Sequence, residues 1–288
     1  MSVSPKSLWR VPVFVPYLQP DLTEEALQKA EREIGFKLPL EYVELLSIQN
    51  GGYIRWGLPG QVHDRIFGIG PKEPALGIPD WKGYGKWLPF KAKEGRKMIQ
   101  FDGDGHWMLC FDYRKNQDTP AITLVDTEDP SEQPVAGSFS AYLKLLQPDV
   151  DEGDFALPNI ADLESLKQHL GIVLGMHPDR PSDAAHGYVQ HRLVREGHQG
   201  KICVWLSPNL VPGSFIRSGI MTRAEWQKRA ASGDQPANPP PGIVRRYPGL
   251  ADEAWIMTVS EEIIPEVVSA VKEFGIEVRP LAECHGLT

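Results

Sequence analysis

Residues Leu22–Gly52, LTEEALQKAEREIGFKLPLEYVELLSIQNGG, decide the fold of the first part of the chain. The stretch opens with Thr23 and two glutamates, a capping hydroxyl followed by acidic residues that favour the positive end of a helix. Gly35 is a typical residue for the end of that helix. The apolar residues between these points share one helical face, Leu27, Ala30 and Ile34. The pattern predicts a first helix between Thr23 and Gly35.

A second helix is predicted directly after the first. Pro39 restarts the chain, because proline suits the first turn of a helix. Asn50–Gly52 end this helix with residues that tolerate positive φ. Its apolar face consists of Tyr42, Leu45 and Leu46.

Between residues 53 and 135, short apolar runs alternate with Gly, Pro, Asn and Asp clusters, which is typical of strands joined by turns. FDGDGHWMLCFDYR, residues 101–114, predicts two strands around an Asp-Gly turn. SFSAYLKLLQ, residues 138–147, predicts a closing helix capped by Ser138 or Ser140. Helices, an antiparallel meander and a helix make an α+β domain over residues 1–148. The strand candidates are Tyr53–Trp56, Arg65–Ile69, Trp87–Phe90, Met98–Phe101, Trp107–Asp112 and Ala121–Asp126.

Residues 147–159 are acidic and rich in turn formers, which indicates a linker. Beyond it we expect a second, smaller α+β domain over residues 160–288. The strand–helix–strand order near its end is one that can pair in parallel through a right-handed crossover. Its expected helices are Asp162–Leu170, Thr222–Ala231 and Glu262–Phe274, and its expected strands are Gly187–Val194, Lys201–Leu206, Trp255–Val259 and Ile276–Leu281.

Residues from about 22 to 146 resemble the SUKH superfamily, most closely its Smi/Knr branch. Three passages carry this resemblance. They are the opening stretch Leu22–Gly52, the hairpin FDGDGHWMLCFDYR, and Pro134–Ala136 followed by SFSAYLKLL. The second part resembles no family that we can name. The resemblance implies an α+β fold and a non-catalytic binding role. It also implies, for a bacterial member, immunity to a polymorphic or contact-dependent toxin, which would be masked by direct binding.

Composition narrows the class of partner. The formal net charge is −8, and both parts are mildly acidic, so neither has the basic surface of a nucleic-acid binder. A basic protein partner, such as a nuclease toxin domain, fits this charge. The three cysteines are widely spaced and suggest reduced thiols. We find no signal peptide and no apolar run long enough to span a membrane, and therefore expect a cytoplasmic protein.

No cofactor or metal is predicted. Asp102, Asp104 and Asp112 suggest a calcium loop at first sight, but an EF-hand loop that starts at Asp102 needs glycine at its sixth position and glutamate at its twelfth. The sequence has Trp107 and Tyr113 there. Turn chemistry is the better interpretation of these carboxylates.

The predicted partner-binding residues are acidic and aromatic residues of the loops. The acidic ones would attract a basic partner and speed its association. Tryptophans are ordinary core residues but are also enriched at interface hot spots, and exposure is expected for Trp81 and Trp87, which flank a glycine-rich loop. The full set is Trp56, Trp81, Tyr84, Trp87, Asp102, Asp104, Asp126, Glu128, Asp129 and Glu132.

Two other classes of function stay open. One is an enzyme, hydrolase-like, with its site in the second part. A deep polar pocket that holds two of the residues His177, His186, His191 and Arg217 would favour it. The other is a regulatory scaffold with several partners.

Overall fold

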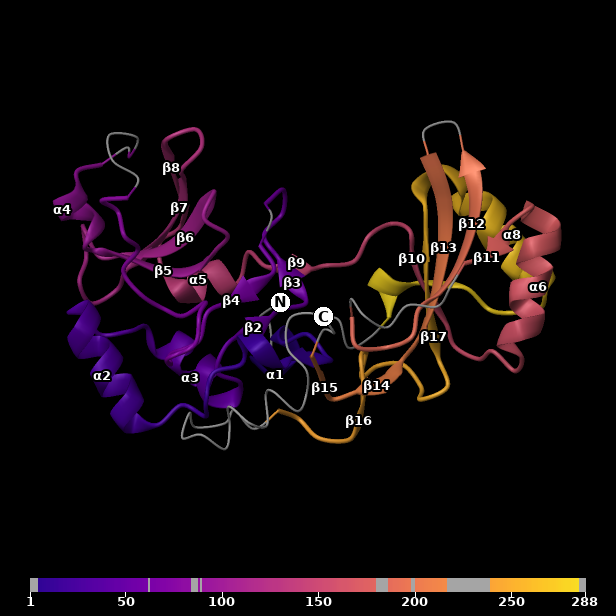
Figure 1. The fold of residues 1–288 in the computed structure, drawn as a ribbon, viewed down its shortest axis with the longest axis horizontal. Coiled ribbons are helices and arrows are strands. Elements are labelled where there is room, and N and C mark those ends of the chain that lie inside the picture. Colours follow the sequence, from indigo (N-terminus) through magenta and orange to yellow (C-terminus); the bar gives the residue numbers. More distant parts are fainter. Residues whose placement is uncertain are drawn as a thin grey trace. The chain divides into compact units, whose positions relative to one another are not determined.

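The computed structural model describes residues 5–61, 63–83, 88, 90–179, 186–197, 200–216 and 239–284. The chain divides into two compact units, of which the first contains the residues up to Gln147 and the second begins at Pro148 (Figure 1). Both units combine helices and sheets, so the predicted α+β class is confirmed. The assignment of domains to residues 1–148 and 160–288 stays a prediction.

The helices of the first unit begin and end close to where their capping residues predict. Thr23 accepts a hydrogen bond from the backbone N–H of Ala26, and Gly35 ends α2 in the left-handed conformation at φ 81°. Ser138 caps α5 in the same way as Thr23 caps α2. The helices are α1 (Pro5–Leu8), α2 (Glu24–Ile34), α3 (Leu40–Ile48), α4 (Ala92–Gly95) and α5 (Phe139–Leu143), with a 3-10 turn η1 (Val15–Tyr17).

The main sheet of the first unit is antiparallel with the order β5-β6-β7-β8. Strand β8 was not predicted, because its acidic sequence SEQPVA contains a proline and lacks an apolar run. It lies at the edge of the sheet, where a missing backbone N–H is tolerated. The strands are β1 (Val13–Phe14), β2 (Gly52–Tyr53), β3 (Trp56–Gly57), β4 (Arg65–Ile66), β5 (Met98–Gly103), β6 (Trp107–Asp112), β7 (Ala121–Asp126), β8 (Ser131–Ala136) and β9 (Gln147–Pro148).

Both faces of the sheet are buried along β5, β6 and most of β7. One face carries Ile99, Phe111 and Ile122 into a core shared with α2, α3 and α5. The other face carries Met98, Cys110 and Val125, and it is covered by aromatic residues of the segment before α4. The near-continuous apolar run of β6 follows from this double burial.

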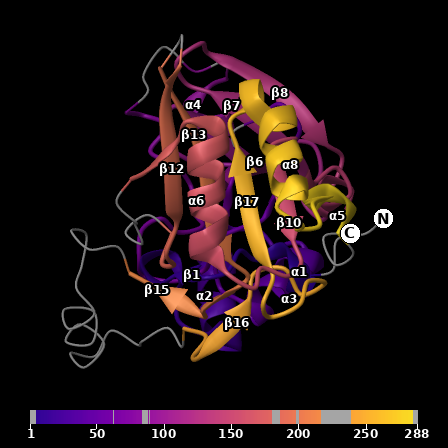
Figure 2. The same cartoon turned by 90° about the vertical axis from the view of Figure 1, so that its right-hand side faces the viewer.

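The second unit has a six-stranded sheet with the order β11-β12-β13-β17-β10-β18, in which neighbouring strands are antiparallel. Helices α6 and α8 lie side by side over one face of it (Figure 2). The elements are β10 (Asp154–Leu157), α6 (Leu163–Leu174), β11 (His177–Pro178), β12 (His191–Gly197), β13 (Gly200–Pro208), β14 (Leu210–Pro212), β15 (Ser214–Phe215), β16 (Ile243–Arg245), β17 (Trp255–Val259), η3 (Glu261–Ile263), α8 (Ile264–Glu273), β18 (Arg279–Pro280) and η4 (Leu281–Glu283).

The two strands at the end of the chain run parallel to each other, as the pattern allows, but they do not pair directly. Strands β17 and β18 both pair with β10, which lies between them, and both pairings are antiparallel. Direct pairing does not occur because β10, about a hundred residues earlier in the chain, occupies the position beside β17. The predicted helix Thr222–Ala231 lies outside the described residues.

Asn50 joins three parts of the first unit. Its side-chain amide donates to the carbonyl oxygens of Pro20 (2.6 Å) and Ile69 (2.8 Å) and accepts from the backbone N–H of Ile69 (2.8 Å). Gly51 follows at φ 90°, and a Cβ there would lie 2.6 Å from the backbone nitrogen of Gly68. The Asn-Gly-Gly motif therefore ends α3 and also fixes the loop that begins near residue 68.

We predict that Asn50→Ala lowers the free energy of unfolding of the first unit by about 3 kcal/mol, since three backbone groups, two of them buried, lose their partner. Native-state hydrogen exchange of the β6 amides measures this change. The control is Asn116→Ala, which removes hydrogen bonds to Asp118 and Thr119 in an exposed turn and should cost less than about 1 kcal/mol. Equal losses in the two variants would contradict the role of Asn50.

Candidate functional site

The candidate site lies at the end of β5, where a β-bulge turns an acidic residue inward. Gln100 pairs with Cys110 but Asp102 pairs with Leu109, so Phe101 is the additional residue. Without the bulge Asp102 would oppose Met108 on the other face of the sheet. With it, the carboxylate points into the helix-covered core and is fully buried.

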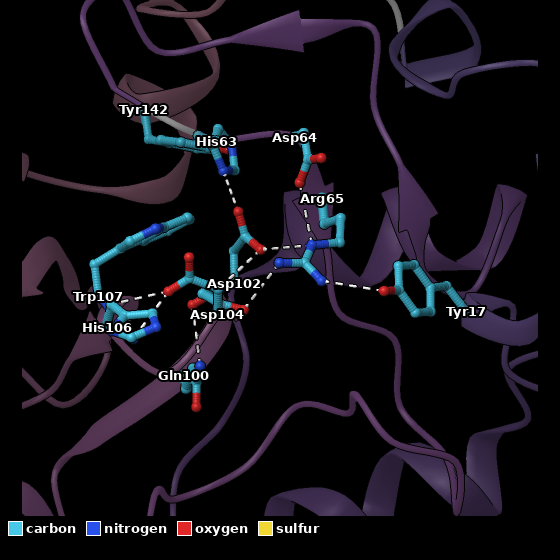
Figure 3. Close-up of polar contacts among 11 residues, drawn as sticks. Tyr17, His63, Asp64, Arg65, Gln100, Asp102, Asp104, His106, Trp107 and Tyr142 are labelled. Atoms are coloured by element: carbon cyan, nitrogen blue, oxygen red, sulfur yellow. Dashed lines mark hydrogen bonds and ion pairs between the residues drawn. The ribbon is translucent and has the colours of Figure 1, made fainter. Parts of the chain in front are cut away.

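His63 and Tyr142 complete a buried polar cluster around this carboxylate (Figure 3). His63 Nδ1 lies 2.5 Å from Asp102 Oδ2, and the side chains are 1% and 0% exposed. His63 Nε2 contacts the hydroxyl of Tyr142 on α5. An ionised carboxylate only accepts, so in a neutral imidazole Nδ1 carries the proton and Nε2 accepts from Tyr142. The cluster thereby ties the loop before β4, the end of β5 and α5 together.

Asp102 and Arg65 bind the two backbone polar groups of Gly103. Asp102 Oδ1 accepts the N–H of Gly103 at 2.7 Å, and Arg65 Nη2 donates to its carbonyl oxygen at 3.2 Å. Arg65 Nε lies 3.7 Å from Asp102 Oδ1 and 3.1 Å from Asp64 Oδ1. Gly103 has φ 142°, and a Cβ there would lie 2.4 Å from the carbonyl oxygen of Trp107. Glycine is therefore required where β5 enters its turn.

The turn that follows presents exposed carboxylates. Asp104 accepts hydrogen bonds from the backbone N–H groups of His106 (2.9 Å) and Trp107 (3.3 Å). The turn between β7 and β8 lies beside it, since the backbone N–H of Thr127 donates to the carbonyl oxygen of His106. The exposed acidic residues of the two turns are Asp104, Glu128 and Asp129, which we call the acidic tip.

The electrostatics of the cluster and of the tip differ. Burial raises the pKa of the Asp102 carboxyl above its usual value, although His63, Arg65 and the Gly103 N–H act in the opposite direction. Burial also raises the pKa of Tyr142, so its phenol stays protonated. At Asp104 slight burial raises the pKa, but the backbone hydrogen bonds of His106 and Trp107 outweigh it and lower the pKa overall. Asp104 is therefore ionised at neutral pH.

The buried cluster has the groups of an acid–base site but no access for a substrate. His63 and Asp102 are sealed from solvent, and the hydroxyl of Tyr142 is buried with them. Within the described parts of the chain, no group of three or more His, Cys, Asp or Glu residues could hold a metal ion. The arrangement can position the turn above it, and the exposed carboxylates of that turn can bind a cation or a basic surface.

The structure changes the position of several predicted binding residues. Asp102 is buried and has no exposed surface to offer a partner. Trp56 is 7% exposed and its Nε1 donates to the carbonyl oxygen of Ser7. Trp81 is 3% exposed, so the expectation of an exposed Trp81 is wrong; its ring packs on Phe90 over the second face of the sheet. Tyr84 and Trp87 lie outside the described residues.

Two predicted acidic residues have structural partners. Asp126 is half-buried and accepts the backbone N–H groups of Glu128 and Asp129, which forms the turn between β7 and β8. Glu132 forms an ion pair with Arg114, which also binds Asp112 through a pair of hydrogen bonds. The charge of Glu132 is thus compensated within the unit.

Sequence reasoning missed His63, Arg65, His106 and Tyr142. The partners of His63 lie 39 and 79 residues away, so no local spacing marks it. Arg65 stands at the start of a predicted strand and carries no motif. His106 lies 2.7 Å from Glu128 across the two turns, a proximity that depends on the pairing of β6 with β7.

The histidines of the second unit do not form a common centre among the residues described. His191 lies beside the ring of Trp255, and His186 stacks on Tyr188. His177 is exposed on the edge strand β11. Burial and then Lys167 lower the pKa of His191, which favours its neutral form. Arg217 lies outside the described residues.

The first unit is an α+β domain in which opening and closing helices share a core with an antiparallel sheet. Residues 21–145 match the model of the SMI1 / KNR4 family (SUKH-1). The chain therefore contains a SUKH-1 domain, which covers less than half of its 288 residues, and the predicted resemblance is confirmed. No curated protein matches the chain.

The SUKH family includes immunity proteins that act against toxins and is generally non-catalytic. Among the residues that the structure describes, no helix is both long and apolar enough to cross a membrane.

We predict that His63→Ala lowers the free energy of unfolding of the first unit by about 4 kcal/mol at pH 7, because it leaves a buried carboxylate with too few partners. The control is His106→Ala, since His106 also contacts a carboxylate but is 68% exposed, and its loss should cost less than about 1 kcal/mol. Hydrogen exchange of the β6 amides measures both.

The stability that the first unit loses in His63→Ala should depend on pH. Without His63, burial raises the pKa of Asp102 still further, so the folded state binds a proton more readily than the unfolded state. The decrease in the free energy of unfolding is therefore smallest below the ordinary pKa that Asp102 has in the unfolded chain. It grows as the pH rises through the raised pKa that Asp102 has in the folded variant. A loss that does not change with pH would contradict the buried-carboxylate explanation.

Proposed function

We propose that this protein is a non-catalytic binding protein, an immunity protein that neutralises a toxin by direct contact. The SUKH-1 domain supports this proposal, because the family includes immunity proteins of this kind. The three described cysteines are buried and unpaired, which suits a reducing cytoplasm.

The acidic tip is the surface that we assign to the toxin. Asp104, Glu128 and Asp129 are exposed, and the pKa of Asp104 is lowered, so the tip is negative at neutral pH. A toxin that acts on nucleic acid carries a basic surface for its own substrate. A negative surface would attract this basic one and cover it, which blocks the toxin without any chemical step.

The buried cluster is the single observation that carries this assignment. Asp102 and Arg65 fix both backbone groups of Gly103, and the next residue is Asp104. The carboxylates of the tip therefore stand on a backbone that is already ordered before a partner arrives. Less conformational entropy is then lost on binding, which favours a tight complex with one partner over loose contacts with many.

Co-expression tests the immunity function. Each toxin-like product encoded beside this gene is expressed in a host with and without this protein, and growth and complex formation are measured. We expect one toxin whose effect on growth is reversed and which forms a stable complex. Rescue without a complex, or no rescue by any candidate, would contradict direct neutralisation.

We predict that Glu128→Lys slows association with the toxin about fivefold at low salt, with a smaller effect as the salt concentration rises. The control is Asp118→Lys, which makes the same change in net charge in the exposed turn between β6 and β7, at the opposite end of the sheet. Stopped-flow or biosensor kinetics give both rate constants. Equal effects would mean that only net charge matters and that the tip is not the contact.

A further inference from the structure

Strand β8 forms one arm of the turn that belongs to the acidic tip, and its own sequence fixes its register only weakly. Register is normally specified by apolar side chains that must face a core. The first four residues of β8, Ser-Glu-Gln-Pro at positions 131–134, lack such a pattern. Pro134 has no backbone N–H for the ladder, and the pairing with β7 shifts by one residue between Ile122 and Thr123. The register of β8 therefore depends on other contacts.

Arg114 supplies such a contact. Its Nε and Nη2 donate to Asp112 at the end of β6, to Oδ1 at 2.9 Å and to Oδ2 at 2.7 Å. Its Nη1 and Nη2 donate to Glu132 of β8, to Oε1 at 2.9 Å and to Oε2 at 2.5 Å. Two forked pairs on one planar guanidinium fix both the distance and the direction between the two carboxylates. We call Arg114, Asp112 and Glu132 the Arg114 clamp.

The Arg114 clamp lies on the second face of the sheet. Glu132 pairs with Val125, which belongs to that face. Asp112 stands two residues after Cys110 on β6, so the two side chains lie on the same side. The side chains of Arg114, Asp112 and Glu132 are 22%, 9% and 23% exposed. Ion pairs that are partly removed from water are screened less than pairs at a fully exposed surface, so this contact can hold a strand in place.

The position of β8 matters for the tip. A slip of β8 by one residue would turn Glu132 to the opposite face and break the clamp. It would also change the length of the turn between Asp126 and Ser131, which holds two of the three carboxylates of the tip. The first arm of this turn is already fixed, because Thr127 is bound by the neighbouring turn between β5 and β6. The place of the two carboxylates is then decided by the second arm, β8.

We propose that Arg114 is a positioning residue for the acidic tip, which holds β8 in one register by clamping Glu132 to Asp112. Its guanidinium acts through β8 and needs no contact with a partner. The inference rests on the proposed function in that the tip is the surface that meets the toxin. It adds that the shape of the tip is set by a residue of the segment that follows β6, at the other end of that strand.

NMR of the full-length chain tests the clamp with Arg114→Lys, which keeps the positive charge but loses the fork. Cross-strand NOEs between Val125 and Glu132 report the native register. Octalysine is the probe of the tip, titrated at low salt and followed by the amide shifts of Glu128 and Asp129. We expect weaker NOEs, exchange between registers confined to residues 127–136, and about threefold weaker binding of octalysine.

Three further variants separate register from other effects. Arg96→Lys makes the same substitution at an exposed position and should leave the NOEs and the binding unchanged. A disulfide between Leu124→Cys and Gln133→Cys, which oppose each other only in the native register, should restore octalysine binding to the Arg114→Lys chain. Glu132→Gln, followed by the NOEs alone, breaks the clamp from the edge strand and keeps the test valid if Arg114→Lys fails to fold.

Two results would overturn the proposal. One is a native set of NOEs with unchanged octalysine binding in Arg114→Lys. The other is weakened binding that the disulfide does not restore, since Arg114 would then act by a route other than the register of β8. Neither measurement uses the toxin. The expected NMR result without toxin rescue would sink the immunity function and leave the clamp standing, and toxin rescue with native NOEs in Arg114→Lys would do the reverse.

Discussion

The contact between His63 and Asp102 is the interaction on which the site depends. A carboxylate removed from water is strongly destabilising unless charged or hydrogen-bonding partners surround it. Here the partners come from distant parts of the chain: His63 and Arg65 from the loop before and the start of β4, and Tyr142 from α5. The bulge at Phe101 brings the carboxylate to them. The first unit can bury this charge only when its loop, sheet and closing helix are all in place.

The buried cluster around Asp102 also explains how the short turn after β5 can be ordered enough to form a binding surface. Exposed turns are usually the least ordered parts of a domain. In this protein the residue before the turn, Gly103, has both its N–H and its carbonyl group bound by buried side chains. The order of the core thus extends to Asp104, and through the backbone contact between His106 and Thr127 to the neighbouring turn. A stable core and an ordered surface have one physical cause here.

The sequence predicts the parts of this structure that follow from local pattern. The capping residues Thr23, Gly35 and Ser138 lie where predicted, and β6 and β7 have the predicted bounds. What failed depends on distant contacts. Asp102 was expected at the surface because a bulge of one residue, which reverses the side of a strand, has no signature in sequence. Trp81 was expected in an exposed loop, but it packs on the apolar side chains of the second face of the sheet and shields them from water. Strand β8 looked like an acidic loop because an edge strand needs few apolar residues.

The acidic tip would act first on the rate at which a partner arrives. Exposed charges act over about 8 Å at physiological ionic strength, so the tip would raise the rate at which a basic partner associates. Once the two surfaces are in contact, the lifetime of the complex depends on the groups buried between them, because most differences in affinity lie in the dissociation rate. The order that Asp102 and Arg65 give to the backbone of Gly103 favours a long lifetime, since less conformational entropy is lost when the complex forms.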